Sequence, residues 1–482
     1  MQPVKIKDIV AAVNGKLLCG DPEEAVTSVS TNSKEINQGT LFVPIIGERV
    51  DAHKFITMAL DAGAVAAFTS EHTENSSDLN KNKAYIQVEN TLTALQQFGA
   101  YYRSLFPIPV IGITGSVGKT TTKEMIAAAL ATEKNVLKTA GNMNSQIGLP
   151  LMMFQIEPEH DIAVIEMGIS ERGEMQRLCN IARPEIAVMT NIGVSHIGQL
   201  GSRENIRKEK LNIINHFGEK EQFEARLYIN GEDDMLSSLL QEDKETVDMD
   251  QPTKDAMKKT KVVSFGQENT NAYYAENVQT VGEETHFIYI SKSGKEDVIL
   301  SVLGIHNVNN AVVALAVAEQ FGIAPNAAKK GLKAYQPIAM RGQVYERDGV
   351  KIIDDTYNAS PDSMKSGIHV LLEMQGITRR ITLLADVLEL GDVSQKCHYE
   401  VGSYIAALEK EGKKIDTVFT VGTEAAFIAD AVRTEGKDIF TKSFSSNEEA
   451  VSYLKSYLKE GDAIMLKGSR GMHIDEIVEA LK

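Results

Sequence analysis

A glycine-rich turn near residue 115 has the residue types needed to bind phosphate. Residues 115–121 are Gly-Ser-Val-Gly-Lys-Thr-Thr, and they stand between an apolar strand-like run and a segment of good helix formers. The backbone amides of such a turn and the amino end of the helix converge on one anion-sized space. Lys119 can then reach the outer phosphates of a nucleotide, and the Thr120 hydroxyl can ligate magnesium. Ile113 stands where the strict pattern has glycine, so the sequence predicts a variant phosphate loop; the alternative is a turn without a ligand.

Two polar side chains follow predicted strands and would lie at the same edge of a sheet. Glu166 lies at the end of the apolar run at residues 162–167, and His196 follows the strand predicted at residues 186–190. Parallel strands gather ligands at their carboxyl ends, so Glu166 is a candidate magnesium ligand facing the phosphate loop. Magnesium prefers oxygen, so a structural role stays open for His196. For Glu166 the alternative is a solvated strand end.

Four further polar residues have open roles. Lys210 lies in a charged segment typical of the polar face of a surface helix, and nothing local distinguishes it from Lys208. Asn309 can cap the helix predicted after it. Arg341 and Asp355 are charges at predicted domain edges, where ligand sites often form, but interdomain salt bridges would use the same charges.

The elements that would position these residues fall into three stretches. In the first, short strands alternate with a helix, which indicates a small α/β domain. The second has apolar strands separated by helices, which indicates a parallel sheet with both faces covered. In it, residues 219–261 are rich in charge and predict exposed helices and loops, and residues 273–303 predict antiparallel strands with a hairpin turn at Ser293 and Gly294.

The third stretch repeats the alternation of strand and helix. It predicts a doubly wound domain, with Ser360 as the N-cap of a helix that starts at Pro361. Proline-containing segments at residues 104–109 and 335–342 separate the stretches. We therefore expect an α/β protein of three domains, at residues 1–106, 107–336 and 337–482. Their fold classes are a small α/β domain, a central P-loop ATPase domain with a parallel sheet, and a Rossmann-like domain.

Composition excludes several classes of protein. The 482 residues are 43% apolar, which is enough to build a core in each of three domains. With 50 basic and 66 acidic residues the net charge is −16, so a nucleic acid is not the expected partner. Three widely spaced cysteines are typical of free thiols in a reducing compartment. No apolar run reaches the ~18 residues of a spanning helix, so we expect no membrane insertion and a cytoplasmic location.

Several longer motifs occur along the chain, and with them the whole chain resembles the Mur ligase family. The motifs are GITGSVGKTTTKEM at 112–125, GNMNSQIGLP at 141–150, VIEMGIS at 164–170, TNIGVSHIG at 190–198, GIHNVNNA at 304–311, MRG at 340–342, DDTYNASPDSM at 354–364 and LADVLELGD at 384–392. The segment LFVPIIGERVDAHKFI at 41–56 is similar to a uridine nucleotide-sugar binding segment. The Asp-Asn-Pro-Arg motif expected in members that add diaminopimelate or lysine is absent, which favours a member that adds a dipeptide.

The resemblance implies an ATP-dependent, ADP-forming ligase. Its substrates would be UDP-N-acetylmuramoyl-tripeptide, bound by the first domain, and D-alanyl-D-alanine, bound by the third, and we expect a monomer. The implied ATP-binding residues are Thr114, Gly115, Ser116, Val117, Gly118, Lys119, Thr120, Thr121, Asn309, Arg341 and Asp355. Two magnesium ions are implied, with Thr120, Glu166, His196 and Lys210 as ligands. The lysine ligand would be carbamylated, which turns a cation into a carboxylate-like group, and the implied catalytic residues are Lys119, His196 and Lys210.

The implied contacts to the nucleotide-sugar substrate are less well defined by the motifs. They are Ser33, Gly47, Asp51, His53, Asn142 and Asn144. Asn32, Ser33 and Lys34 stand where the family often has an acidic residue, a hydroxyl residue and arginine, so the diphosphate contacts there stay open. The alternatives are another ligase of the family, a folylpolyglutamate synthase, or a P-loop ATPase module that performs no ligation. The uridine-type first domain argues against the folate enzyme.

Overall fold

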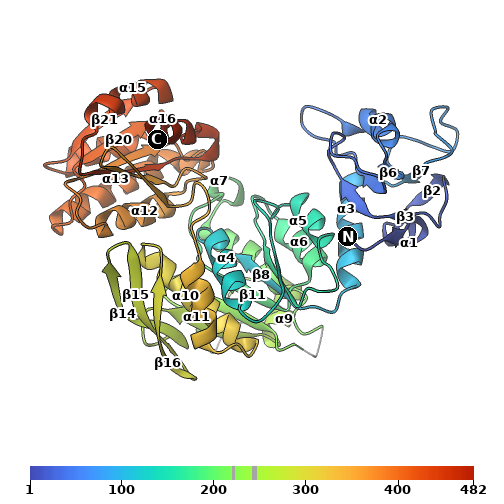
Figure 1. Cartoon of the computed structure of the whole chain (residues 1–482), viewed down its shortest axis with the longest axis horizontal. Coiled ribbons are helices and arrows are strands. Elements are labelled where there is room, and N and C mark those ends of the chain that lie inside the picture. Colours follow the sequence, from blue (N-terminus) through green and yellow to red (C-terminus); the bar gives the residue numbers. More distant parts are fainter. Residues whose placement is uncertain (220–222, 242–246) are drawn as a thin grey trace.

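The computed structural model describes residues 1–219, 223–241 and 247–482. Its sheets define an N-terminal unit (residues 1–104), a central unit (residues 110–334) and a C-terminal unit (residues 343–482). In Figure 1 the N-terminal unit, in blue, and the C-terminal unit, in orange and red, stand at opposite ends of the central unit. The α/β architecture with three sheet-containing parts confirms the predicted fold class.

The N-terminal unit is built on a five-stranded sheet of order β2-β7-β6-β5-β4, parallel except for the β2–β7 pair. Strands β1 and β3 form a separate antiparallel pair. Strands β5, β6 and β7 are short and buried, as the apolar runs predict. The elements are β1 (Val4–Lys5), α1 (Ile6–Ala12), β2 (Lys16–Cys19), β3 (Ala25–Val26), β4 (Ser28–Ser30), β5 (Thr40–Phe42), η1 (Ala52–Phe55), α2 (Ile56–Asp61), β6 (Ala66–Thr69), β7 (Ala84–Gln87) and α3 (Thr91–Ser104).

The central unit contains a nine-stranded sheet of order β16-β15-β14-β13-β12-β11-β8-β10-β9. Its strands from β9 to β13 are parallel, and β14, β15 and β16 form an antiparallel extension, as predicted. The elements are β8 (Val110–Thr114), α4 (Lys119–Leu130), β9 (Val136–Lys138), α5 (Gly148–Met153), β10 (Ile162–Glu166), α6 (Glu174–Ala182), β11 (Ile186–Met189), α7 (Ile197–Leu200), α8 (Arg203–Leu211), η2 (Asn212–Ile214), β12 (Arg226–Asn230), η3 (Ser237–Leu240), α9 (Gln251–Lys258), β13 (Lys261–Gly266), β14 (Tyr273–Val281), β15 (Glu284–Ser291), β16 (Gly294–Leu300), α10 (Ile305–Gln320) and α11 (Pro325–Ala334).

Strand β8 lies between β10 and β11, and the register of these strands determines where the site forms. Ile113 pairs with Glu166 on β10, and Thr114 pairs with Met189 on β11. The carboxyl ends of the three strands are therefore level. Helices α4, α10 and α11 pack on one face of the sheet and α5, α6 and α8 on the other, so the strands are buried on both sides.

The C-terminal unit has a six-stranded sheet of order β17-β18-β22-β19-β20-β21, parallel except for the edge strand β17. The Ser360 hydroxyl accepts a hydrogen bond from the Ser363 amide and caps α12, which starts at Pro361 as predicted. The elements are β17 (Gln343–Arg347), β18 (Val350–Asp354), α12 (Pro361–Glu373), β19 (Arg379–Ala385), η5 (Gly391–Val393), α13 (Ser394–Lys410), β20 (Thr417–Val421), α14 (Ala426–Glu435), β21 (Phe440–Phe444), α15 (Asn447–Tyr457), β22 (Asp462–Lys467), η6 (Arg470–Met472) and α16 (Asp475–Leu481).

Two expectations about the central elements are wrong. Residues 219–261 were expected to be exposed helices and loops, but β12 at Arg226–Asn230 is an inner strand with buried Leu227, Tyr228 and Ile229. Dense flanking charge obscures this short apolar run; residues 220–222 and 242–246 of the segment lie outside the described part. In addition, α10 begins at Ile305, so Asn309 lies inside the helix and does not cap it.

The connection between the N-terminal and central units is held by a buried arginine. Arg103, near the end of α3, is 1% exposed. Its guanidinium donates to the carbonyls of Phe106 at 2.8 Å, Ile108 at 2.9 Å and Ala182 at 3.1 Å, and it lies 3.4 Å from Glu185 Oε1. These bonds fix residues 105–109 against the central unit. Among the described helices, none is long and apolar enough to cross a bilayer.

Candidate functional site

The phosphate loop lies between β8, which ends at Thr114, and α4, which begins at Lys119. Gly115 has φ +149° and Gly118 has φ +86°, in the region that favours glycine. A Cβ atom on Gly115 would overlap the Thr190 hydroxyl, which itself donates to the Val117 carbonyl. Both glycines are therefore required by the path of the turn. The predicted strand, turn and helix are all present.

Two lysines donate to the same carbonyl of this loop. Lys119 Nζ lies 2.8 Å from the Gly115 oxygen, and Lys210 Nζ lies 3.0 Å from the same atom. Burial lowers the pKa of Lys119, and it lowers the pKa of Lys210 well below its usual value of 10.5. The positive charge of Lys119 adds to the effect on Lys210. Lys210 is therefore poised to lose its proton.

The structure distinguishes Lys210 from Lys208 on the same helix, α8. Lys210 is 2% exposed, so the expectation of a solvated face is wrong for this residue. Lys208 instead faces outward and forms ion pairs with Asp248 and Asp250. One side of this charged helix is buried. The charge pattern of the segment alone does not predict that one of its lysines is buried beneath the phosphate loop.

Glu166 has the environment of a cation ligand. It is 2% exposed, and its Oε1 accepts a hydrogen bond from Asn144 Nδ2 at 2.8 Å. Its Oε2 is buried without a partner, as is the Thr114 hydroxyl at the end of the neighbouring strand. Buried carboxylate oxygens are normally satisfied, so the unpaired Oε2 of Glu166 fits a hard cation such as Mg²⁺. Thr120, in the first turn of α4, lines the same cavity as Glu166.

His196 sits at the boundary between the central and C-terminal units. Its Nδ1 lies 3.0 Å from Oε2 of Glu389, a residue that follows β19. The backbone of His196 is left-handed, with φ +61°, which is unusual for a residue other than glycine. Hydrogen bonding to His196 lowers the pKa of Glu389.

A cavity of about 650 Å³ opens between the central and C-terminal units. Its central wall contains the predicted residues Ser116, Val117, Gly118, Lys119, Thr120, Thr121, Asn142, Asn144, Glu166 and His196. Its opposite wall contains the predicted residues Arg341 and Asp355. The phosphate loop and the predicted charges of the third domain therefore face one space, which is large enough for a nucleotide.

The wall from the C-terminal side combines charge with an aromatic surface. The Arg341 guanidinium stacks over the Tyr357 ring with 3.9 Å between its central carbon and the ring centroid. Asp355 Oδ2 accepts from Lys467 Nζ at 2.6 Å. Asp355 and Lys467 both belong to the C-terminal unit, so this salt bridge is not the interdomain pair that the sequence left open.

Four other predicted residues do not line the cavity. Lys210 lies beneath the loop, and Thr114 is the last residue of β8. Asn309 receives a hydrogen bond from Gln267 Nε2 at 2.9 Å, on the side of α10 away from the cavity lining. Gly115 shapes the loop from within.

The predicted nucleotide-sugar contacts divide between two places. Asn142 and Asn144 line the cavity, whereas Ser33, Gly47, Asp51 and His53 belong to the N-terminal unit. Gly47 and Ser33 lie in turns on the surface of that unit, and the Gly47 amide donates to the Val50 carbonyl. The structure therefore does not bring the six residues into one group.

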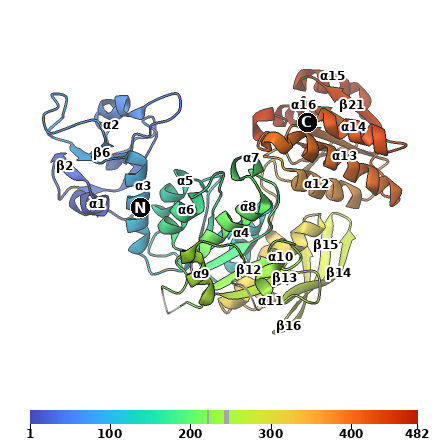
Figure 2. The same ribbon diagram turned by 180° about the vertical axis from the view of Figure 1, so that it is seen from behind.

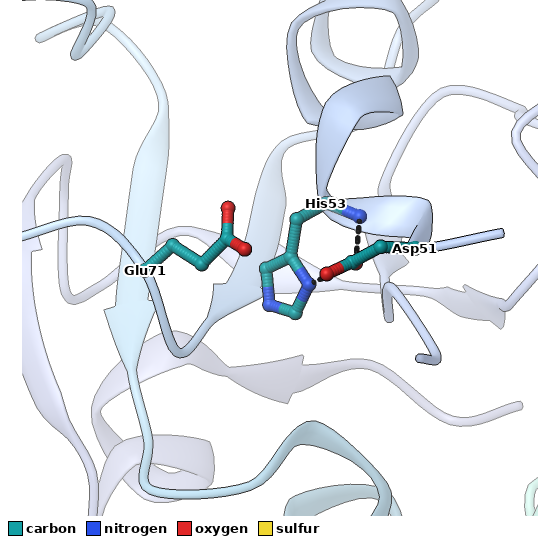
Figure 3. A group of neighbouring side chains, drawn as sticks. All are labelled: Asp51, His53 and Glu71. Carbon is teal, nitrogen blue, oxygen red and sulfur yellow. Dashed lines mark hydrogen bonds and ion pairs between the residues drawn. The ribbon is translucent and has the colours of Figure 1, made fainter. Parts of the chain in front are cut away.

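Asp51 and His53 form a network shown in Figure 3. Asp51 Oδ1 accepts from the His53 amide at 2.9 Å and lies 2.7 Å from His53 Nδ1. On the other side of the ring, His53 Nε2 lies 3.0 Å from the hydroxyl of Ser70, which the figure does not draw. The hydrogen bond from the His53 backbone is the main cause of a lowered pKa for Asp51. Glu71 points toward the same imidazole. One of its carboxylate oxygens lies within 4.8 Å of a carboxylate oxygen of Asp51 and of a ring nitrogen of His53. The hydrogen bonds to both ring nitrogens account for the orientation of the buried imidazole.

Some cavity residues were not found from the sequence. Asn310, not Asn309, faces the phosphate loop, and its Oδ1 accepts from Thr122 Oγ1 at 2.9 Å. His306 and Lys467 also line the cavity. Lys467 ends a buried parallel strand, β22, and this is the same signal that identified Glu166. His306 was not predicted because its place depends on the start of α10 at Ile305. Burial lowers the pKa of its imidazole to about 4.

Three family models match consecutive parts of the chain. The Mur ligase family, catalytic domain matches residues 25–103, the Mur ligase middle domain matches residues 113–318, and the Mur ligase, glutamate ligase domain matches residues 340–470. Each match coincides with one of the three structural units.

Individual relatives match over nearly the full length. The UDP-N-acetylmuramoyl-tripeptide–D-alanyl-D-alanine ligase of Bacillus subtilis (strain 168) is 38% identical over 99% of this chain and 98% of its own. A crystal structure of MurF from Acinetobacter baumannii superposes with a TM-score of 0.87 at 28% identity, covering 100% and 99% of the two chains. The MurF ligase from Thermotoga maritima in complex with ADP has a TM-score of 0.79 at 29% identity, covering 94% and 96%. With three family models matched in order and relatives aligned from end to end, this chain belongs to the Mur ligase family.

Proposed function

We propose that this chain is an ATP-dependent ligase that joins D-alanyl-D-alanine to UDP-N-acetylmuramoyl-tripeptide, forming the pentapeptide precursor of peptidoglycan and releasing ADP and phosphate. The observation that carries the proposal is the cavity in which the phosphate loop faces Arg341, Asp355 and Lys467 of another unit. A nucleotide held there would have its outer phosphate accessible to an acceptor. The full-length similarity to a ligase of that name supports the choice of substrates.

Each unit has one role in this proposal, with boundaries at residues 1–106, 107–336 and 337–482. The first domain binds the UDP end of the acceptor through Ser33, Gly47, Asp51 and His53. The second binds ATP through residues 114–121, and Asn142 and Asn144 bind the peptide end of the acceptor. The third supplies Arg341 and Asp355 to the nucleotide and receives the dipeptide.

The reaction has two steps. The terminal carboxylate of the tripeptide attacks the γ-phosphorus of ATP in line, and an acyl phosphate and ADP form. The amine of D-alanyl-D-alanine then attacks the acyl carbon, and phosphate leaves from the tetrahedral intermediate. Lys119 offsets charge on the phosphoryl oxygens. Contact between the central and C-terminal units excludes the water that would hydrolyse the acyl phosphate.

The proposal includes two magnesium ions. Thr120 and Glu166 would hold one ion, which the unpaired Oε2 of Glu166 supports, and His196 and a carbamylated Lys210 would hold the other. Bound magnesium supplies Lewis-acid stabilisation of negative charge on phosphate. Lys210 meets the requirement for carbamylation because its lowered pKa favours the neutral amine. That amine adds to carbon dioxide and releases one proton, and the product is an anionic ligand.

The remaining properties follow from the same proposal. A net charge of −16 opposes binding of nucleic acid, and the substrates are small molecules of the cytoplasm, where we place the enzyme. We propose that it works as a monomer, because the cavity is completed by units of one chain.

The direct test is mass spectrometry of the product formed from UDP-N-acetylmuramoyl-tripeptide, ATP and D-alanyl-D-alanine. We expect one product, whose mass exceeds that of the nucleotide-sugar tripeptide by the mass of the dipeptide less one water. Sustained ADP release should depend on both the tripeptide and the dipeptide. Equal ATP turnover without the acceptors would favour an ATPase module, and a product with a single amino acid would favour another ligase of the family.

Replacement of the loop lysine provides a second test. Lys119→Ala should abolish product formation and leave the circular dichroism spectrum unchanged, because its ammonium contacts loop carbonyls and no core side chain. Lys396→Ala, at a side chain that is mostly exposed on α13, is the matched control and should keep full activity. An active Lys119→Ala enzyme would contradict the assigned phosphate role.

A further inference from the structure

The contact between His196 and Glu389 joins two units, each of which has its own sheet. The imidazole belongs to the segment after β11 of the central unit, and the carboxylate belongs to the segment after β19 of the C-terminal unit. Nδ1 of His196 and Oε2 of Glu389 are 3.0 Å apart. Within the described part of the chain, Nε2 of His196 makes no hydrogen bond, so one ring nitrogen is held and the other is available.

The backbone around this pair is also docked across the boundary. The Gly198 amide lies 3.4 Å from the Glu389 carbonyl, and a Cβ atom on Gly198 would crowd that carbonyl and the Gly391 amide. Val194 and Ile197 pack against the apolar core of the C-terminal unit. Figures 1 and 2, which view the molecule from opposite sides, both place α7 next to the C-terminal unit. The loop that carries His196 is therefore held by the other unit as well as by Ser116 of the phosphate loop.

The backbone of His196 adds a second indication that its orientation is imposed. A φ of +61° in a residue with a side chain is costly, and such strain persists where the surroundings determine it. His196 lines the same cavity as Lys119 and Glu166, and the negative charge of Glu389 acts on Lys119. The pair is thus close to the phosphate loop as well as to the boundary.

Histidines that bind metals usually donate the other ring N–H to a carboxylate, which fixes the tautomer and the ring plane and raises the basicity of the ligand nitrogen. We propose that Glu389 is the positioning residue for His196 as a magnesium ligand, so that the second magnesium site is complete only when the C-terminal unit is docked. The inference rests on the proposed function, which supplies the two magnesium sites. Beyond the proposed function, the inference assigns a role to Glu389 of the C-terminal unit. Through this residue, metal binding and docking of that unit depend on each other.

This arrangement requires reciprocity. If docking of the C-terminal unit strengthens metal binding at His196, then metal binding must strengthen docking by the same factor. Loss of the Glu389 carboxylate should break both effects together. A carboxylate that served only to hold the two units in contact would affect docking, and the affinity for metal in the docked state would not change.

The experiment measures Mn²⁺ binding, without turnover, by electron paramagnetic resonance in the presence of a non-hydrolysable ATP analogue. We expect the wild-type chain to bind two ions and Glu389→Ala to weaken one of them about tenfold to a hundredfold, the range typical for loss of such a partner. Glu389→Gln, which keeps the size of the side chain, should weaken the same ion less. The exposed Glu411→Gln on the same unit is the matched control and should bind as the wild type does.

A double variant separates positioning from a structural effect. His196→Ala should lose the same ion, and Glu389→Ala should cost nothing further in that background, because Glu389 acts through His196. Interdomain distances from paired spin labels on the central and C-terminal units should shorten with Mn²⁺ in the wild type and respond less in Glu389→Ala. Thermal unfolding confirms that each variant is folded.

The outcomes distinguish this inference from the proposed function. Unchanged Mn²⁺ affinity in folded Glu389→Ala and Glu389→Gln, or independent losses in the double variant, would overturn the role of Glu389 while the two sites stand. A wild-type chain that binds fewer than two ions with the nucleotide analogue would count against the proposed metal sites themselves.

Discussion

At the scale of single residues, Lys210 has the most informative environment. Its amino group lies beneath the phosphate loop, where burial lowers its pKa, and it shares the Gly115 carbonyl with Lys119. We expect Lys210→Ala to lose ligation by at least about a hundredfold, and short carboxylic acids to restore part of the activity by replacing the carbamate. Ligation rates measured with and without added formate or acetate check this. Lys208→Ala, on the exposed side of the same helix, is the control and should need no rescue.

Failure of every short acid to restore Lys210→Ala, together with the absence of a carbamate signal in ¹³C spectra of the wild type under labelled bicarbonate, would contradict carbamylation. The phosphate-binding role of Lys119 would not be affected by that result.

His306 gives a prediction about pH and stability. Burial lowers its pKa from 6.5 to about 4, and Nδ1 is buried without a hydrogen bond. Between these pH values the unfolded chain binds a proton that the folded chain does not, so stability rises with pH across this window and falls on acidification. The contribution lost between pH 6.5 and pH 4 is about 3 kcal/mol.

The measurement is urea unfolding of the wild type and His306→Gln from pH 4 to pH 7. The difference between the two free energies of unfolding should vary with pH in this window. A constant difference would show that the imidazole titrates normally in the folded chain.

Sequence alone predicted the positions of the site residues that belong to a local pattern. Lys119, Thr120 and Glu166 lie where the loop motif and the strand end place them. Burial of Lys210 and the pairing of His196 with Glu389 depend on contacts over long distances in the chain, which no local pattern contains. Asn310 was missed because the helix starts at Ile305, before the predicted start at Asn309, and it is Asn310 that faces the loop.

At the scale of elements, the β8–α4 turn depends on Gly115. Its φ of +149° disfavours a side chain, and an added methyl would overlap the Thr190 hydroxyl. We expect Gly115→Ala to weaken ATP binding at least about tenfold, because the loop must move to accept the methyl group. Calorimetry with an ATP analogue measures this. Gly282→Ala, at a turn with positive φ and open space, should cost about 1 kcal/mol of stability and leave nucleotide affinity unchanged.

Equal nucleotide affinity in Gly115→Ala and the wild type would mean that the turn adapts without changing the phosphate site, and the argument from its backbone would be wrong.

Elements with regular patterns were predictable and irregular ones were not. The strands at residues 162–167 and 186–190 and the capped helix at Pro361 are present because apolar runs and a serine cap determine them locally. Strand β12 was not predicted, because five residues between charged segments are too few to show a strand pattern. Its place in the sheet comes from pairing with β11 and β13.

At the scale of the whole molecule, Arg103 determines how the N-terminal unit is attached. Its guanidinium satisfies three carbonyls that belong to the linker and to α6. We expect Arg103→Met to lower the free energy of unfolding by about 3–5 kcal/mol, since buried carbonyls lose their donors. Differential scanning calorimetry should also separate an earlier transition of the N-terminal unit. Arg433→Met, at an exposed side chain of α14, is the control.

A single transition at the wild-type temperature in Arg103→Met would show that apolar packing of α3 on the central unit suffices without the arginine.

The three-part division itself was predictable, because proline-containing segments and a change of pattern mark both boundaries. The arrangement of the parts was not predictable, since it depends on contacts such as the cap that Glu373 of α12 gives to the amides of Gly304 and Ile305.

The carbonyl shared by Lys119 and Lys210 has a consequence for ligand discrimination. An arriving anion must replace bonds that Lys119 already makes to the Gly115 and Ser116 carbonyls. Free orthophosphate offers few contacts in return, whereas a triphosphate reaches the loop amides and the opposite wall at once. We therefore expect the resting enzyme to bind free orthophosphate weakly and ATP tightly, because the Lys119 ammonium group is already hydrogen-bonded before any ligand arrives.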